Sequence, residues 1–427
     1  MNVRRPTVVI VGAGFAGINA AKELRGAPVQ VVMLDRNNYH LFQPLLYQVA
    51  MALLPQTQIA YPVRAIFRKQ ANFRFQLAEV QQVDFDQRIV QTSGGPVSYD
   101  YLILSVGGET NTFGLESVAR HGFGLKDLSD AMRLRNHILK TFERASLETE
   151  PEILQALKTF VIVGGGPTGV ECAGALSELI RNALSRDFPE MDVQDIRVIL
   201  IEATDHLLAG FPPELSREAA STLEKKGVEI FFGAAVDGYD GKQVLLKDGV
   251  KIPTNTLIWA AGVRAGSLMD RLGLQQARQG RVRVGPTLQV PGRPEVFICG
   301  DAAYLEEDGQ ALPMMAPVAI QQGKTAARNI LRILSGQKLE PFEYHDPGSL
   351  ATIGRNAAVA RVNGFKFHGF LAWVVWLAVH LFWLIGFRNR LIVLISWAWD
   401  YFFYEWADRL ITPEVEQEAE ILPAGRV

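Results

Sequence analysis

Two glycine-rich turns, each preceded by an apolar strand, constrain the fold of this 427-residue chain more than any other feature. One lies in the sequence TVVIVGAGFAG and the other in TFVIVGGGPTG. In the spacing G-x-G-x-x-G, the first glycine permits a tight strand-to-helix turn and the second lets backbone approach a pyrophosphate, while the third allows close strand–helix packing. The positive end of the following helix also favours phosphate. Two sets of glycines have this spacing: Gly12, Gly14 and Gly17, and Gly164, Gly166 and Gly169.

Each glycine turn is followed by a second apolar strand that ends in an acid. The sequence VQVVMLDR reaches Asp35, and IRVILIE reaches Glu202. A carboxylate in this position can accept a hydrogen bond from a ribose hydroxyl. The combination predicts an α/β fold with two Rossmann-like domains, each of which binds a dinucleotide.

Composition narrows the functional classes further. The net charge is −2, and no basic stripe or zinc-finger pattern is present, so we expect no nucleic-acid partner and no metal site. Cys172 and Cys299 lie far apart and form no C-x-x-C pair, which argues against dithiol chemistry. The apolar run near the N-terminus leads directly into the first glycine turn, and we therefore expect a strand there and no signal peptide.

The two halves repeat one plan, because each closes with a late apolar strand followed by a glycine, Gly107 or Gly262. A further apolar strand, VFICGDAAYL, ends at Gly300 and Asp301. Ligands of such sheets lie beyond the carboxyl ends of the strands, where an acid can meet cofactor hydroxyls. The alternative is that Asp301 caps a helix.

The C-terminal part of the chain differs in character. The run Phe367–Phe387 contains no Asp, Glu, Lys or Arg, and its length is close to the ~20 residues that span a bilayer as a helix. The next apolar segment carries four charged residues and is more typical of an amphipathic helix at a membrane interface: Asp400, Glu405, Asp408 and Arg409. We expect membrane contact through residues 367–410, against the alternative of a buried or dimer-forming helix.

Together these motifs resemble the type II NADH dehydrogenases, which are non-proton-pumping NADH:quinone oxidoreductases. The motifs that carry the resemblance are GAGFAG, GGGPTGVE, ICGDAA, APVAIQQG and the tail HLFWLIGFRNRLIVLISWAWDYF. The resemblance implies non-covalent FAD in the first unit and NADH as co-substrate in the second. It assigns to FAD the residues Gly12, Gly14, Gly17, Asp35, Gly107, Gly300, Asp301 and Ala316, and to NADH the residues Gly164, Gly166, Gly169, Glu202 and Gly262. A carboxylate at Glu202 would repel the 2′-phosphate of NADPH.

The resemblance also suggests which residues act in turnover. Glu171 would face the flavin–nicotinamide contact and modulate hydride or proton transfer, although an acid in a first helical turn is also favoured by the helix dipole. Gln321 is the second catalytic candidate, and Gln321 and Gln322 are the candidates for quinone contact, unless they are ordinary polar residues of a helix. This sequence departs from the family pattern A-Q-x-A-x-Q at Pro317, which replaces the first glutamine. Proline suits a first helical turn, but the side-chain amide is lost.

The resulting hypothesis divides the chain into an FAD-binding domain (1–112 and 285–345), an NADH-binding domain with connecting helices (113–284) and a C-terminal helical membrane-association region (346–427). The protein would oxidise NADH through FAD and reduce a membrane quinone on the cytoplasmic face of the cell membrane. Monotopic attachment, with the tail also helping a homodimer, is favoured over a single span. A reductase of a soluble protein acceptor and a redox-sensing interaction protein are the alternatives. A sulfide:quinone or disulfide reductase would need a cysteine pair that the chain lacks.

Overall fold

The computed structural model describes residues 4–403 and 408–413, so Glu405 lies outside the described residues. The first dinucleotide unit is built on a six-stranded sheet in the order β20-β21-β9-β1-β2-β5. Its strands come from two distant parts of the chain: β1 (Thr7–Val11), β2 (Gln30–Asp35), β5 (Phe73–Leu77), β9 (Tyr101–Leu104), β20 (Gln289–Val290) and β21 (Arg293–Ile298). β1 pairs in parallel with β2 and β9, and β21 pairs in parallel with β9. Helices α1 (Phe15–Glu23) and α11 (Ala316–Leu334) share one hydrophobic core with this sheet.

The second unit has a parallel four-stranded sheet in the order β13-β12-β11-β17. Its strands are β11 (Thr159–Val163), β12 (Arg197–Ile201), β13 (Val228–Phe231) and β17 (Thr256–Trp259). Four helices belong to this half: α6 (Leu128–Ala145), α7 (Pro151–Leu157), α8 (Pro167–Glu178) and α10 (Pro213–Lys225). α8 continues into a π-helical turn, η2 (Leu179–Leu184), and then α9 (Ser185–Asp187). The two sheets confirm the predicted α/β architecture, whereas the boundaries of the domains remain a prediction.

Shorter elements connect these units or decorate them. Between β2 and β11 lie β3 (Tyr39–Leu41), η1 (Gln43–Leu45), α2 (Leu46–Ala50), α3 (Gln56–Ile59), β4 (Ala60–Pro62), α4 (Val63–Ile66), β6 (Val80–Asp84), β7 (Ile89–Thr92), β8 (Val97–Ser98), β10 (Gly108–Thr110) and α5 (Glu116–His121). The short helix η3 (Val193–Asp195) precedes β12. After β12 come β14 (Val236–Tyr239), β15 (Gln243–Leu246), β16 (Lys251–Pro253), β18 (Val263–Ala265), η4 (Ser267–Arg271), η5 (Arg278–Gly280), β19 (Val282–Arg283), η6 (Gly300–Ala302), β22 (Ala303–Tyr304), β23 (Glu306–Glu307) and β24 (Gln310–Ala311).

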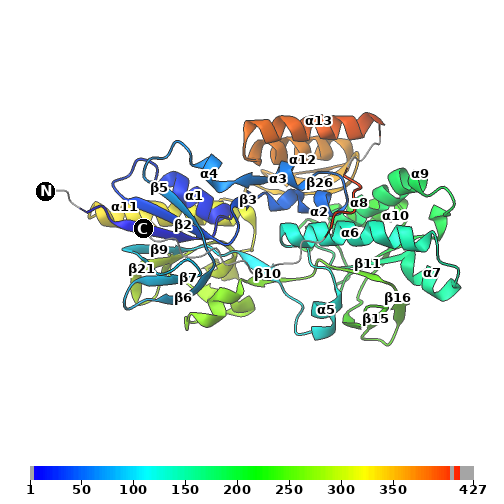
Figure 1. Cartoon of the computed structure of the whole chain (residues 1–427), viewed down its shortest axis with the longest axis horizontal. Helices are drawn as coiled ribbons and strands as arrows, with labels where there is room; N and C mark the ends of the chain where they lie inside the picture. The colour runs from blue at the N-terminus through cyan, green and yellow to red at the C-terminus, as the bar shows by residue number, and fades with distance from the viewer. Residues whose placement is uncertain (1–3, 404–407, 414–427) are drawn as a thin grey trace.

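A two-stranded antiparallel ribbon joins the halves where the chain passes between them. β10 pairs with β18, so that Gly108 lies opposite Ala265 and Thr110 opposite Val263. Figure 1 shows β10 between the sheet that contains β1 and the sheet that contains β11. The two nucleotide-binding units are therefore held side by side by the segments that follow their late strands.

The C-terminal region contains the predicted helices, and a small sheet precedes them. It begins with an antiparallel sheet of β25 (Ser349–Gly354), β26 (Ala357–Val362) and β27 (Phe365–His368). Helices α12 (Gly369–Trp383) and α13 (Phe387–Phe403) follow. The run Phe367–Phe387 is thus shared by a strand, a 15-residue helix and a turn at Gly386, where φ is +92°. Within the described residues, no helix has the length and apolar character needed to cross a membrane.

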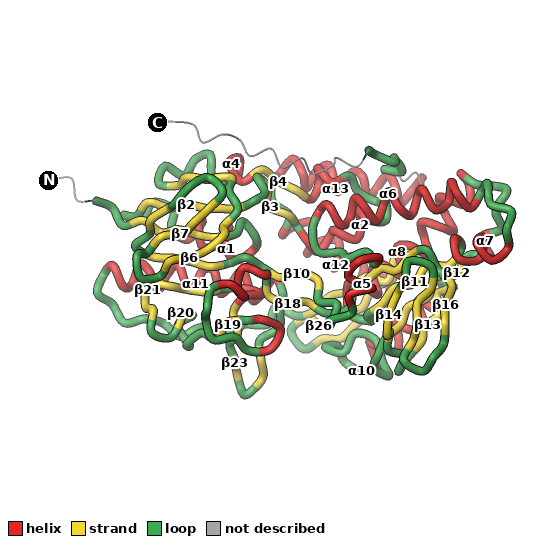
Figure 2. Tube along the Cα trace, turned by 60° about the horizontal axis from the view of Figure 1, so that its bottom comes forward, coloured by secondary structure: helices red, strands yellow, loops and turns green. Residues whose placement is uncertain are grey.

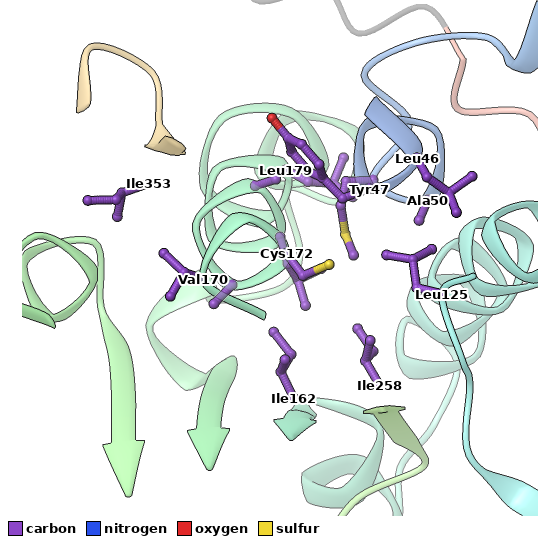
Figure 3. Packing of buried hydrophobic residues seen from close by; sticks show 14 of the residues in the cluster. Leu46, Tyr47, Ala50, Leu125, Ile162, Val170, Cys172, Leu179, Ile258 and Ile353 are labelled. Atoms are coloured by element: carbon purple, nitrogen blue, oxygen red, sulfur yellow. The ribbon is translucent and has the colours of Figure 1, made fainter. Parts of the chain in front are cut away.

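The largest hydrophobic core gathers around α8, from three parts of the chain. Residues of α2, α8 and β25 share this core with the parallel strands β11 and β17. Figure 3 shows the thiol of Cys172 among apolar side chains that include Leu125, Ile162 and Ile258, with Tyr47 beside them. Burial raises the pKa of the Cys172 thiol, which makes it a packing residue rather than a nucleophile. α12 and α13 lie together along one outer edge, over α2 and α3 (Figure 1).

Candidate functional site: two nucleotide loops and the cavity between them

The loop between β1 and α1 has the geometry that its glycine spacing predicts. Gly12 adopts φ +99°, and a Cβ at Gly17 would lie 1.9 Å from the carbonyl oxygen of Gly12. A Cβ at Gly14, by contrast, would meet no protein atom within 4 Å. The first and third glycines are therefore required by the protein itself, and the second leaves open space beside the N-terminus of α1, where a pyrophosphate fits.

The loop between β11 and α8 repeats this geometry closely. Gly164 adopts φ +108°, and a Cβ at Gly169 would lie 1.8 Å from the carbonyl oxygen of Gly164. Gly166 again faces open space, with no protein atom within 4 Å of an added Cβ. The two loops are thus equivalent cradles, and both fit a dinucleotide phosphate.

The two strand-terminal acids also make equivalent contacts. Asp35 Oδ2 accepts the backbone N–H of Ala13 at 2.6 Å, and Glu202 Oε2 accepts the N–H of Gly165 at 2.6 Å. Burial raises the pKa of Asp35, although its two backbone hydrogen bonds oppose that shift. The second oxygen of each carboxylate also accepts a backbone N–H, from Asn37 in the first loop and from Thr204 in the second. Each carboxylate therefore stabilises its own glycine loop before any ribose is present.

A single cavity of about 1210 Å³ extends from the first loop toward the second unit. The predicted FAD residues on its wall are Gly12, Gly14, Asp35, Gly107, Gly300, Asp301 and Ala316. From the second unit the wall includes Glu171 and Gly262, but Gly164, Gly166, Gly169 and Glu202 lie outside it, as does Gly17 behind the first loop. The structure thus brings the FAD candidates together with Glu171, and the second loop reaches the cavity through Pro167 and Thr168 and not through its glycines.

Asp301 and its neighbour are held at the cavity from two directions. Lys126 Nζ lies 3.3 Å from Asp301 Oδ2, and both residues line the cavity. The N–H of Gly300 donates to Gln322 Oε1 at 2.7 Å. Asp301 therefore keeps a charged partner at the cavity and does not serve as a helix cap by a side-chain hydrogen bond.

Glu171 is a buried carboxyl group of this cavity, on the first turns of α8. Burial raises its pKa to about 8, against weaker opposing effects from the N–H of Thr352 and the indole of Trp376. The N–H of Thr352 lies 3.5 Å from Glu171 Oε1, at the long limit of a hydrogen bond. At neutral pH the carboxyl therefore holds a proton, which it can release to or recover from a reacting neighbour.

Helix α12 supplies the apolar end of the cavity wall. Its lining residues are Val375, Val379, His380 and Trp383. His380 stacks on Trp376 with ring centroids 4.0 Å apart, and its Nδ1 lies 2.7 Å from the carbonyl oxygen of Trp376. Burial lowers the pKa of His380 to about 4, so its ring is neutral. This end of the cavity is therefore lined by apolar side chains and a neutral imidazole.

Gln321 and Gln322 are not among the residues that line the cavity, and their contact with a quinone stays a prediction. Gln322 is fully buried and bonds to Gly300, while Gln321 exchanges hydrogen bonds with the backbone of His345 at 2.9 and 3.0 Å. The lining of the cavity at this helix comes from Ala316, Pro317 and Ala319. α11 starts at Ala316, as the proline predicted, and the two glutamines lie in its second turn, beyond the residues that line the cavity.

Several residues of the site carried no signal in the sequence. His40 Nδ1 contacts the carbonyl oxygen of Ala13 at 2.8 Å, which supports the first loop from its other side. Tyr47, Lys126 and His380 line the cavity from segments without a recognisable motif. Their roles depend on tertiary contacts, so one sequence alone could not indicate them.

These features define a class of flavoprotein, and comparison with known families agrees. Residues 6–323 match the family model of the pyridine nucleotide-disulphide oxidoreductases. Residues 347–404 match the model of the NDH2 C-terminal domain. Both cysteines are buried and unpaired, so this chain has the fold of the class without its disulphide.

The particular family follows from whole-chain relatives. The chain is 41% identical over 410 residues to the type II NADH:quinone oxidoreductase Ndh of Mycobacterium tuberculosis, covering 92% of this chain and 88% of the relative. It is 31% identical over 436 residues to the internal alternative NAD(P)H-ubiquinone oxidoreductase A1, mitochondrial, of Arabidopsis thaliana, with coverages of 93% and 84%. The chain belongs to the type II NADH:quinone oxidoreductase family.

A solved structure agrees on the fold. NDH2 from Plasmodium falciparum, in complex with NADH, superposes with a TM-score of 0.88 at 20% identity, over 96% of this chain and 100% of the other. The sulfide:quinone oxidoreductase of Aquifex aeolicus is more distant, with a TM-score of 0.72 at 17% identity, over 94% and 96% of the two chains. Both similarities concern the fold alone.

Proposed function

We propose that this chain is an FAD-dependent enzyme that oxidises NADH and reduces a membrane quinone by two electrons without pumping protons. The observation that carries the proposal is the single cavity that joins the first glycine loop, Glu171 and the apolar wall of α12. Such a cavity can hold a flavin between a nicotinamide on one side and a hydrophobic acceptor on the other. Family membership supports the same reaction.

The residues divide this work between them. Gly14 and Gly166 leave the space that the two pyrophosphates need, and Asp35 and Glu202 stand at the ribose ends. When bound, FAD supplies the chemistry by taking hydride from NADH and passing electrons on. Glu171 would hold a proton beside the reacting rings, because burial keeps its carboxyl neutral up to about pH 8. Glu202 would disfavour NADPH by repelling its 2′-phosphate.

Attachment to the bilayer would use the outer faces of α12 and α13. Large apolar side chains are exposed there: Phe370, Leu371, Val374, Phe382, Phe387, Leu391, Leu394, Ile395, Trp399, Phe402 and Phe403. Arg388 stands exposed beside them. Helices of this kind lie in the interface plane with their apolar face among the acyl chains. We therefore place the protein as a peripheral enzyme on the cytoplasmic face of the cell membrane, with dimerisation through the tail as a further possibility to measure.

The test is steady-state oxidation of NADH by the purified FAD-loaded protein, with and without a short-chain quinone, and with NADPH in parallel. We expect fast turnover that requires quinone and favours NADH over NADPH. A flavin that NADH reduces but that quinone does not reoxidise would overturn quinone reduction, and would favour a protein acceptor or a redox sensor.

A further inference from the structure

Helix α13 is joined to the α2–α3 segment by polar side chains on its inner face. The indole Nε1 of Trp397 donates to Gln48 Oε1 at 2.9 Å. Gln58 Nε2 donates to the hydroxyl of Ser396 at 3.1 Å, and Asn389 Nδ2 donates to the carbonyl oxygen of Gln58 at 3.0 Å. The helix that faces outward with its apolar side is therefore bonded inward to the FAD-binding half of the molecule.

The contact of Trp397 fixes the direction of the Gln48 amide. An indole N–H can only donate, so its partner must be the amide oxygen, and the amide NH₂ group is left for the opposite side. On that side Gln48 Nε2 donates to the phenolic oxygen of Tyr47 at 2.8 Å. Gln48 is buried, with 5% of its surface exposed, so no water competes freely for either contact.

Tyr47 is the end of this chain of hydrogen bonds, and it forms part of the cavity wall. Its ring meets Trp376 edge-on with centroids 6.4 Å apart, and it lies near Glu171. Burial and the charge of Glu171 raise its pKa well above the usual value, so the phenol stays protonated. Figure 3 shows Tyr47 reaching toward α8, between α2 and the helix that carries Cys172. The position of Tyr47 thus depends on Gln48, and Gln48 is held by α13.

The opposite face of α13 is the face proposed to meet lipid. Ile395 and Trp399 are each exposed by about half, and each lies two residues from Trp397, on the other side of the helix. A change in how α13 is seated on a bilayer therefore acts within one turn on the residue that orients Gln48. Three segments that are far apart in the sequence, α13, α2 and α8, are in contact here.

We propose that Gln48 and Trp397 are positioning residues that make the placement of Tyr47, and with it the quinone end of the cavity, depend on the seating of α13 on the membrane. This inference rests on the proposed quinone reduction. Its consequence is that lipid promotes quinone turnover through a defined pair of hydrogen bonds, in addition to any effect of concentrating quinone in the bilayer.

The experiment compares the full-length FAD-loaded protein with Trp397→Phe and Gln48→Met, which keep side-chain volume and remove the hydrogen bonds. Quinone kcat/KM is measured with a short-chain quinone, with and without phosphatidylethanolamine/phosphatidylglycerol vesicles. We expect each variant to lose about fivefold to tenfold with vesicles present, the size of one buried hydrogen bond. The stimulation that vesicles give the wild type should also disappear. Ser396→Ala, which breaks a neighbouring inner contact of α13 that does not lead to Tyr47, should stay within twofold.

A double-mutant cycle makes the test specific to Tyr47. In a Tyr47→Phe background, Trp397→Phe should lower kcat/KM by less than a further twofold, because the hydrogen bond between Gln48 and Tyr47 is already absent. Fully additive losses, or a loss in Ser396→Ala equal to that in Trp397→Phe, would overturn the inference. Flavin content reports folding, and if Trp397→Phe loses flavin, Gln48→Met decides the question from the other end. A wild type without quinone turnover would refute the proposed function instead.

Discussion

The two glycine loops share the same local geometry and differ in what surrounds them. Both have a first glycine at positive φ, a third glycine pressed on the carbonyl of the first, and an acid that holds the loop at 2.6 Å. The first loop, however, is also bonded by His40 and opens into the cavity, whereas the glycines of the second lie outside it. A loop whose glycines line the cavity suits a cofactor that stays, and a loop whose glycines lie outside it suits a substrate that must leave. The surroundings of the loops, rather than the motif, distinguish the two.

The helices behind the loops are also clamped in parallel ways. A Cβ at Gly323 of α11 would lie 2.2 Å from the carbonyl oxygen of Ala16 on α1. A Cβ at Gly174 of α8 would lie 2.2 Å from the carbonyl oxygen of Ile353 on β25. In the first unit the clamp comes from the same domain, and in the second it comes from the C-terminal sheet. The close packing of α8, the helix that follows the second glycine loop, therefore depends on the C-terminal region.

The third glycines offer the largest expected effects. Gly17→Ala and Gly169→Ala each place a Cβ within 2 Å of a carbonyl oxygen, an overlap that costs roughly 1–3 kcal/mol or more. We expect Gly17→Ala to be purified without flavin, and Gly169→Ala to keep flavin that NADH reduces slowly. Flavin absorbance and single-turnover reduction measure both. Loss of flavin in Gly169→Ala would show that the two loops are not independent.

Substitutions of the two strand-terminal acids, Asp35 and Glu202, should have the next largest effect, on nucleotide binding. Glu202→Ala should raise the KM for NADH about tenfold to a hundredfold, because a hydrogen bond to a charged group contributes roughly 1.5–3 kcal/mol. It should also narrow the preference for NADH over NADPH. Asp35→Ala should instead increase the rate of FAD loss, since its ligand is enclosed. Glu229→Gln on the adjacent strand β13, whose carboxylate pairs with Arg197, is the control and should leave KM unchanged. An equal KM in Glu202→Ala would remove Glu202 from the site.

The smallest effect concerns the helix position two residues after each third glycine. In α1 this residue is Asn19, whose side chain donates to the carbonyl oxygen of Phe15 at 2.8 Å, and in α8 it is Glu171. The pKa of Glu171 is raised from 4.5 to about 8, so the folded protein binds a proton that the unfolded chain releases in this interval. Stability must then fall as pH rises from about 4.5 to 8.

Glu171→Gln should remove that slope. We expect the Tm of the variant to exceed that of the wild type at pH 8 and to match it near pH 5, with a shift of ~2–4 °C for each kcal/mol of stability that the wild type loses over this interval. Asn19→Ala is the control, because it removes a hydrogen bond without a titrating group and should leave the slope unchanged. Thermal unfolding of the FAD-loaded protein from pH 5 to 8 measures both, and an unchanged slope in Glu171→Gln would contradict a buried neutral carboxyl.

Much of the fold followed from periodicity and glycine spacing, while the quinone end of the site did not. The two glutamines of α11 share one sequence motif, but helical rotation sends Gln322 to Gly300 and Gln321 to His345. The apolar run Phe367–Phe387 suggested one long helix, yet pairing of β27 with β26 takes its first residues and Gly386 ends the remainder. Local composition cannot show which neighbours compete for a segment.

The sequence by itself determined the two nucleotide loops, because a positive φ and a position with no room for a Cβ are local demands that glycine alone meets. It also determined the acids at the ends of β2 and β12, since their place follows from strand length. Tertiary structure alone decided that Glu171 is buried and neutral, that His380 and Tyr47 line the same cavity, and that α13 bonds to α2. The pKa of Glu171 and the shape of the cavity arise from desolvation by segments far apart in the chain, and only folding brings those segments together.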